Sequence, residues 1–231
     1  MRRQTRIRAI EGVFILLTIM LSFYLEDLRQ DRQEISKKDQ LLQDLKAVVT
    51  EDIAQIGALE QTLRNSLICI ERLQQDLASK DASLRPQQVI DNILCIEVGH
   101  SFFPKDGVYA QLVSTGALEL IEDAALKSLI LEVYTHHKAR NYATSNEIDM
   151  FNIDFRRAVL ANFRIRFAYD ADDGVFYGSK NVVSSELNRD YYLSNEFFGL
   201  LGQASLYANM YLRQLSDIKA TYIEITQQLE P

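Results

Sequence analysis

Two cysteines, Cys69 and Cys95, are the residues of this chain whose spacing best suits a covalent bond. The sequence predicts a turn near residues 80–85, and the cysteines lie at nearly equal distances along the chain on either side of it. In an antiparallel helix pair such positions face each other, provided that both side chains point into the seam. A disulfide requires Cα atoms within about 7 Å and an oxidising compartment. We predict that Cys69 and Cys95 are neighbours and form a candidate disulfide, with two buried free thiols as the alternative.

Three histidines, His100, His136 and His137, are candidate metal ligands. Adjacent residues on a helix point about 100° apart, so His136 and His137 do not chelate one ion easily. We interpret this pair as a solvated helix edge.

An acidic segment with Asp170, Asp172, Asp173 and Gly174 is similar to the start of a calcium-binding loop. The last position of such a loop holds a glutamate, and here that position is Asn181. The segment is therefore interpreted as an acidic surface loop.

The sequence contains no phosphate-binding Gly-Lys loop, no dinucleotide fingerprint, no H-E-x-x-H pair and no CxxC. We therefore predict no catalytic residue, no cofactor, no metal site and no enzymatic activity. The net charge is −7. This argues against a nucleic-acid partner, because phosphate binding needs a concentrated basic surface.

Aromatic side chains crowd the C-terminal quarter of the chain. At helical spacing they are predicted to be core and half-core residues, and an exposed patch that docks a partner is the alternative. The set comprises Tyr191, Tyr192, Phe197, Phe198, Tyr207, Tyr211 and Tyr222.

An apolar heptad repeat predicts the element that positions the first cysteine. The repeat indicates one helix from about residue 7 to about residue 80, and Ile56 and Leu63 are expected to be buried in the middle of its stripe. If the repeat residues occupy position a of the heptad, position d holds Leu45 and Leu73 but also Asp52 and Ser66. The resulting apolar stripe suits a helix in a multi-helix bundle better than a two-stranded coiled coil. The repeat positions are Leu28, Ile35, Leu42, Val49, Ile56, Leu63, Ile70 and Leu77.

The start of the same helix has the composition of a membrane anchor. Residues 12–25 carry no charge and follow a basic flank of four arginines. Residues 7–25 would make about 28 Å of helix, near the hydrocarbon thickness of about 30 Å. A cleaved signal peptide is the rival interpretation, but residues 22–28 lack a small-residue cleavage pattern. The denser positive charge before the span favours a cytoplasmic N-terminus, with the body outside the inner membrane.

The remaining chain is predicted to be all-α. Hydrophobic residues make up 47% and charged residues 25% of the 231 positions, which is typical of a folded body, and we find no sustained period-two alternation of a strand. The predicted organisation is a basic flank and transmembrane anchor over 1–25, a polar stalk over 26–40 and an elongated antiparallel helical bundle over 41–231. Further helices are expected over residues 85–98, 108–114, 124–166, 186–193 and 194–229. The helix over 124–166 is expected to break at 141–146 and to be capped by Asp123. Gly116 is expected in the left-handed conformation, and residues 169–184 are expected to form a loop.

The order of these motifs resembles a bacterial family of uncharacterised single-pass membrane proteins, classed as a domain of unknown function. Its pattern is a short basic start, an apolar span entered by Glu-hydrophobic, and a long following helix. The matching span here is Glu11 to Ile15, and the later segment comprises Tyr109, Leu112, Thr115-Gly116 and Leu118 to Ile121, continued by Leu126 and Tyr134. The resemblance implies the architecture only.

These features favour a membrane-anchored helical interaction or scaffold protein of the bacterial envelope. Its expected partners are the lipid bilayer and another protein, or a second copy bound through the helical bundle. The alternative is a ligand-sensing bundle that signals through a membrane partner.

Overall fold

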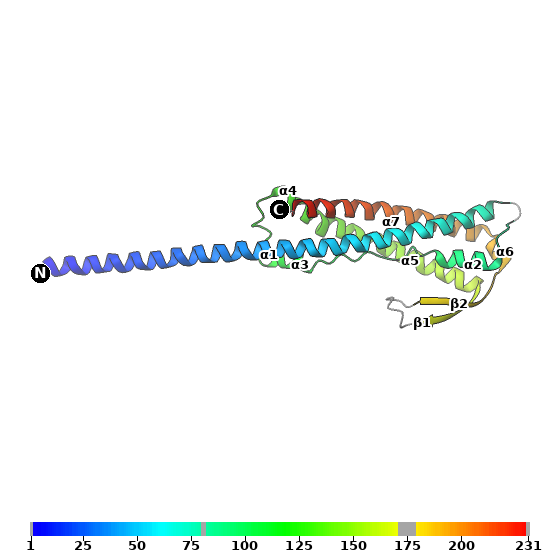
Figure 1. The fold of residues 1–231 in the computed structure, drawn as a ribbon, viewed down its shortest axis with the longest axis horizontal. Helices are drawn as coiled ribbons and strands as arrows, with labels where there is room; N and C mark the ends of the chain where they lie inside the picture. Colours follow the sequence, from blue (N-terminus) through cyan, green and yellow to red (C-terminus); the bar gives the residue numbers. More distant parts are fainter. Residues whose placement is uncertain (1, 80–81, 171–178, 230–231) are drawn as a thin grey trace.

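A single helix of 77 residues, α1 (Arg2–Ala78), organises the molecule. The computed structural model describes residues 2–79, 82–170 and 179–229, and among them the side chains of 14–79, 82–168 and 181–229. The first part of α1 projects as a rod, and its second part is one helix of an elongated body (Figure 1). No proline and few glycines interrupt this sequence before Pro86, which explains why one helix continues through both parts.

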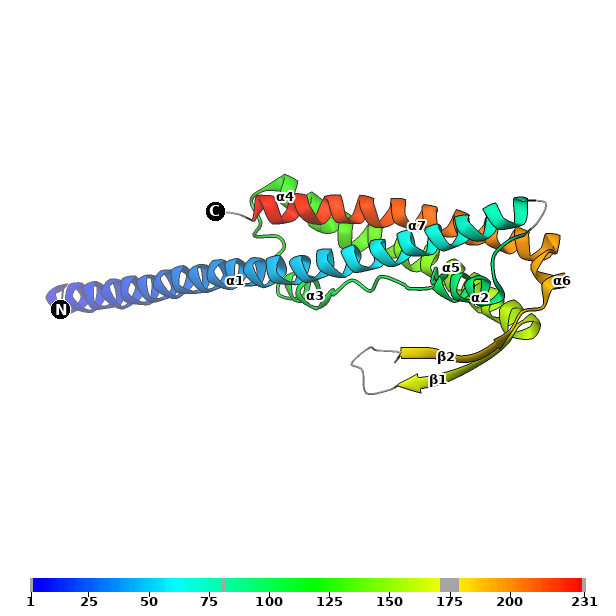
Figure 2. The ribbon, with the colours of Figure 1, turned by 45° about the vertical axis from the view of Figure 1, so that its right-hand side comes forward.

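The body is built around an antiparallel pair of helices, α1 and α7 (Asn195–Gln228). Asp52 of α1 meets Tyr222 of α7, whereas Asp76 near the end of α1 meets Tyr192 just before α7 begins, which fixes the antiparallel direction. Ser194 caps α7 by accepting a hydrogen bond from the backbone N–H of Phe197. The second view shows α7 running beside the C-terminal half of α1 (Figure 2).

The predicted heptad stripe forms the centre of the core from residue 41 onward. Ile56 and Leu63 are fully buried, as predicted, together with Val49 and Ile70. Leu28 and Ile35 belong to the same stripe but are 36% and 49% exposed. Residues 26–40 therefore stand clear of the body, because no helix of the described chain covers this part of α1.

A short helix, α2 (Pro86–Cys95), follows the turn after α1, with Pro86 in its first turn, where the missing N–H of proline costs nothing. It ends earlier than predicted, and residues 96–106 continue without regular secondary structure to α3 (Gly107–Ser114). Gly99 lies so close to α5 that an added Cβ would be 2.2 Å from the side-chain nitrogen of Asn152. Gly116 has the predicted left-handed conformation, with φ of 73°.

The third predicted helix is three consecutive helical segments. Asp123 caps α4 (Ala124–Leu131) through the N–H groups of Ala125 and Leu126, as predicted. The π-helical turn η1 (Glu132–His137) and then α5 (Lys138–Asn162) continue it. The expected break at 141–146 is wrong: the irregular turn lies earlier, and α5 is regular through this region.

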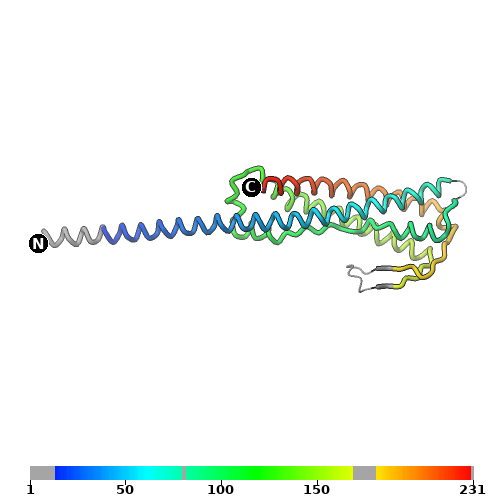
Figure 3. Tube along the Cα trace, viewed as in Figure 1, coloured from blue at the N-terminus to red at the C-terminus, as the bar shows by residue number. Residues whose placement is uncertain are grey.

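A β-hairpin corrects the prediction of an entirely helical chain. β1 (Arg164–Asp170) pairs antiparallel with β2 (Ser179–Glu186) where the end of a helix and a loop were expected. Alternation of Arg164, Ile165, Arg166 and Phe167 is the period-two pattern of a strand, too short to stand out in the sequence. The expected helix over 186–193 is reduced to α6 (Arg189–Tyr192), which Asn188 caps by accepting a hydrogen bond from the N–H of Tyr191. The chain is mostly helical, and the hairpin lies beside the body (Figure 3).

The predicted membrane span, residues 7–25, lies at the start of α1. The side chains of residues 1–13 are outside the described set. Among the described residues, no helix contains a window both long and apolar enough to cross a membrane.

Candidate functional site

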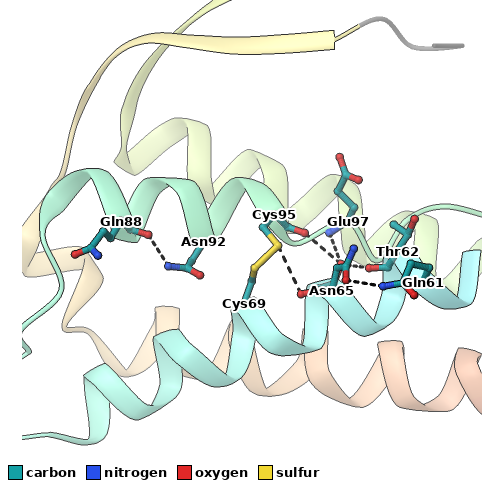
Figure 4. Close-up of a disulfide and its surroundings, with 9 residues drawn as sticks. Gln61, Thr62, Asn65, Cys69, Gln88, Asn92, Cys95 and Glu97 are labelled. Atoms are coloured by element: carbon teal, nitrogen blue, oxygen red, sulfur yellow. Dashed lines mark hydrogen bonds between the residues drawn. A yellow bond between two sulfur atoms is a disulfide. The ribbon is translucent and has the colours of Figure 1, made fainter. Parts of the chain in front are cut away.

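The two cysteines meet at the seam between α1 and α2. The structure joins Cys69 and Cys95 in a disulfide with a Cα–Cα distance of 6.2 Å. Both residues are partly exposed, and Figure 4 shows the bond spanning the two helices. Because Cys95 is the last residue of α2, the bond ties the end of this helix to the middle of α1.

Ser66 extends this attachment to the first residues after α2. Its hydroxyl accepts from the N–H of Glu97 at 2.9 Å, and its one proton is shared between the carbonyl oxygens of Thr62 at 3.0 Å and Cys95 at 3.2 Å. Ser66 is fully buried at a heptad position. Ser66, a polar residue within the apolar stripe, therefore supplies a hydrogen-bond partner to backbone groups at the end of α2.

Asp76 performs a similar function at the end of α1. Its carboxylate accepts hydrogen bonds from the N–H groups of Ser83 and Leu84 at 2.6 and 2.9 Å, and from the Tyr192 hydroxyl at 2.7 Å. Burial alone would raise the pKa of Asp76, but the hydrogen bonds from Tyr192, Leu84 and Ser83 outweigh it and lower the pKa. Burial and the adjacent carboxylate raise the pKa of Tyr192.

Asp52 is the corresponding carboxylate in the other half of the body. Its Oδ2 accepts from the Tyr222 hydroxyl at 3.0 Å and from the N–H of Lys105 at 3.1 Å. Its Oδ1 and the hydroxyl of Tyr134 are buried without a hydrogen-bond partner among the described residues. The pKa of Asp52 is raised, because the effect of burial is larger than that of the hydrogen bonds from Lys105 and Tyr222, which lower the pKa.

Tyr211 of α7 lies between Tyr192 and Tyr222 in the sequence, and it binds the extended segment over residues 96–106 that also contains Lys105. Its hydroxyl accepts from the N–H of Phe102 at 2.7 Å and donates to Asn141 at 3.1 Å. Asn141 in turn donates to the carbonyl oxygen of Phe102 at 2.8 Å. One tyrosine and one asparagine thereby satisfy both polar backbone groups of a buried residue.

These polar clusters hold backbone in place. Burial raises the pKa values of Tyr134, Tyr192 and Tyr222, so their hydroxyls stay protonated. The hydroxyls of Tyr192 and Tyr222 donate to Asp76 and Asp52. A small cleft of about 280 Å³ lies beside the disulfide; it is lined by Cys69, Arg72, Leu84, Gln88, Asp91 and Asn92.

The histidine pair was only partly predicted. His136 is exposed, as expected of a helix edge, but His137 is 8% exposed and its Nε2 lies 3.3 Å from the Thr221 hydroxyl of α7. The π-helical turn brings His137 against α7, where burial lowers its pKa and favours the neutral ring. In the described part of the chain, no group of three or more metal-ligating side chains converges. The acidic segment at Asp172, Asp173 and Gly174 lies outside the described residues, as does the side chain of Asp170.

The aromatic residues of the C-terminal quarter are mainly core residues. Tyr192, Phe197, Tyr211 and Tyr222 are buried, whereas Phe198 is 45% exposed. Tyr191 and Tyr207 are half-buried and donate to Glu196 and Glu147.

The most exposed apolar surface lies on the projecting part of α1. All twelve residues from Phe14 to Leu25 are exposed, and Phe14 and Leu25 are 72% and 57% exposed. The hydroxyls of Thr18 and Ser22, the polar residues of this stretch, bond to the carbonyl oxygens of Phe14 and Thr18 within the helix.

Comparisons with protein-family models, with curated proteins and with solved structures found no match to this chain.

The roles of Asp52 and Asp76 were not predicted from the sequence. The signal was present for Asp52, because a carboxylate in the middle of an apolar heptad stripe must be hydrogen-bonded when it is buried. The partners themselves, Lys105 and Tyr222, are far away in the sequence and were not predictable from it.

Proposed function

We propose that this protein is a membrane-anchored helical scaffold of the bacterial envelope, which holds a partner protein through its body. The observation that carries the proposal is the apolar stretch at the free end of α1. Residues 14–25 carry no charge and are exposed on all sides of the helix. A helix that is hydrophobic all round is stable in lipid or inside protein, and it is costly in water.

The flanking charges support the same proposal. Four arginines precede the apolar stretch, and charged residues of both signs follow it from Glu26 to Asp39. Basic residues at the cytoplasmic end of a span are typical of a single-pass anchor. A body outside the membrane also suits the disulfide, because oxidising compartments maintain such bonds.

Membrane retention of the full chain tests the anchor. Membranes from the expressing bacterium are washed with alkaline carbonate, and the N-terminus of the retained protein is sequenced. We expect retention with the original start, and Leu17→Arg should release part of the protein because an arginine at the centre of a span costs about 2.5–3.5 kcal/mol. Arg32→Leu, in the stalk, is the control that leaves retention unchanged. Release of the unaltered chain, or a mature start beyond Leu25, would contradict the anchor.

The scaffold role is tested by purification from a mild detergent extract after cross-linking. A stoichiometric partner protein is the expected result. A retained small molecule and no protein would favour the ligand-sensing alternative.

A further inference from the structure

The β-hairpin carries an open edge on its outer side. β1 and β2 pair with each other, and no third strand joins either of them within the described residues. In both ribbon views β1 is the strand farther from the helices of the body (Figures 1 and 2). The outer edge of such a strand presents unpaired N–H and C=O groups, which can pair with another extended chain.

The irregularity of the hairpin lies on β2 and leaves β1 regular. Arg166 pairs with Ser184 and Phe167 pairs with Val182, so Val183 is the extra residue and belongs to β2. A bulge on an edge strand interrupts pairing and protects the edge. Because the bulge is on the inner strand, β1 keeps an uninterrupted edge.

The charge around β1 is opposite to that of the whole chain. Residues 155–169 contain four arginines, although the net charge of the protein is −7. The acidic residues next to this segment are Asp154, which pairs with Arg157 at 3.1 Å, and Asp170 at the far end of β1. Arg164 and Arg166 alternate with the half-buried Ile165 and Phe167, so the two arginines share the exposed face of the strand. The side chain of Arg164 is 87% exposed. Its guanidinium nitrogen lies 3.4 Å from a carboxylate oxygen of Glu186 on β2, in an ion pair whose acidic side chain is 73% exposed. Arg156 and Arg157, near the end of α5, are also exposed.

These observations identify the kind of chain that fits the edge. A strand added beside β1 would place its alternate side chains next to Arg164 and Arg166, where acidic residues are favoured and basic residues are disfavoured. A second copy of β1 would bring arginines against arginines, so self-pairing at this edge is disfavoured. Backbone pairing would supply affinity, and the alternating charges would supply specificity.

We propose that β1 binds an extended acidic segment of a partner protein by β-strand addition. This inference rests on the proposed scaffold function and names the class of its partner. Arg164 and Arg166 select acidic residues at alternate positions, and the free backbone edge of Arg164–Ala168 supplies the hydrogen bonds.

The test uses the full chain in detergent micelles and two fluorescent peptides, Thr-Glu-Val-Glu-Val-Glu-Thr and its counterpart with lysine in place of glutamate. We expect the acidic peptide to bind and the lysine peptide to bind at least about tenfold more weakly. The double variant R164E/R166E should weaken the acidic peptide about tenfold or more, since two favourable cross-strand pairs become repulsive. The matched control R64E/R213E, which reverses two exposed arginines on α1 and α7, should change the affinity less than about twofold.

Hydrogen exchange separates strand addition from loose charge attraction. Bound peptide should protect backbone amides of Arg164–Ala168 more than those of Asn181–Glu186, and R164E/R166E without peptide should keep the exchange pattern of the folded hairpin. Equal binding of both peptides, unchanged affinity in R164E/R166E, or protection confined to β2 would overturn the inference. Tighter binding of an oligonucleotide, or dimerisation through the hairpin, would overturn it as well. If the peptide experiments fail while the protein is still retained in membranes and still co-purifies with a partner protein, strand addition at β1 is refuted and the proposed scaffold function is not.

Discussion

Tyrosine hydroxyls attach irregular backbone to the helices at three levels of the body. Tyr222 shares Asp52 with the N–H of Lys105, Tyr211 binds the N–H of Phe102, and Tyr192 shares Asp76 with residues 83–84. Segments without secondary structure cannot satisfy their own backbone groups. Side chains from α7 and the neighbouring helices therefore supply the missing partners, which explains how residues 96–106 lie against α1 without being helical.

Removing one of these hydroxyls should destabilise the fold. In Tyr222→Phe, Asp52 keeps only the N–H of Lys105 as a donor in a fully buried site. We expect the free energy of unfolding to fall by about 1–3 kcal/mol, measured by urea denaturation of the full chain in detergent. Tyr142→Phe is the matched control, because Tyr142 is 71% exposed, and it should change stability by less than about 0.5 kcal/mol. Equal effects of the two variants would show that the hydroxyl of Tyr222 contributes nothing.

The two buried aspartates should respond to pH in opposite directions. The pKa of Asp76 is lowered on folding, so its contribution to stability is present above the unfolded pKa of about 3.9 and is lost as the pH falls through the folded value. The pKa of Asp52 is raised on folding, so its contribution is present below about 3.9 and is lost as the pH rises through the folded value.

Asparagine variants separate these contributions when the urea midpoint is measured between pH 3 and pH 7. Asp76→Asn should lose stability at neutral pH and reduce the decline of the wild type on acidification. Asp52→Asn should reduce the loss of stability that accompanies a rise from acidic to neutral pH. Parallel changes in the two variants would contradict the opposite signs of the two pKa shifts.

At the scale of elements, the sequence predicted the helices because their signals are local. The heptad stripe, Asp123 and Gly116 each mark a feature that depends on neighbouring residues. The hairpin was missed because its strands are short and pair across a connection. The burial of His137 was missed because it depends on a π-helical turn and on α7, which is distant in the sequence.

The register of the α1 stripe can be tested with two aliphatic residues on the same helix. Leu63 is fully buried, whereas Ile68 is 55% exposed. Leu63→Ala should lower the free energy of unfolding by about 2–5 kcal/mol, because it leaves a cavity in the core. Ile68→Ala should change it by less than about 1 kcal/mol. Thermal unfolding followed by circular dichroism gives both values, and an unchanged transition for Leu63→Ala would refute the packing of this stripe.

The α1–α2 attachment gives a second prediction for this part of the body. The disulfide closes a loop with a sequence separation of 26. The double variant C69S/C95S should therefore lose roughly 3 kcal/mol of stability on the chain-entropy model. Mass spectrometry of protein alkylated without reduction should show no modified cysteine when the protein is purified from its native host. Two alkylated thiols would dismiss the bond and would weaken the case for a body outside the membrane.

At the scale of the whole molecule, the rod and the body are one continuous helix with two different environments. From Leu41 onward the apolar stripe of α1 is covered by the body, whereas residues 26–40 make no buried contact. A helix of this stalk's length spans about 22 Å. In the proposed arrangement the stalk acts as a spacer, which keeps the body and its hairpin at a fixed height above the bilayer.

Shortening the stalk by one heptad should lower the body without disturbing it. Deletion of residues 29–35 removes about 10 Å of helix and rotates the body by only about 20°. All seven residues are exposed, so the thermal unfolding of the body should not change. The height is measured in lipid vesicles by energy transfer from a dye on a cysteine introduced at the exposed Ala124 of α4 to an acceptor at the lipid surface. Replacement of the same residues by a helix-forming heptad of alanine, glutamate and lysine is the control and should keep the original distance. An unchanged distance after the deletion would show that the stalk is not a rigid spacer, and a lower unfolding temperature would show that it packs against the body.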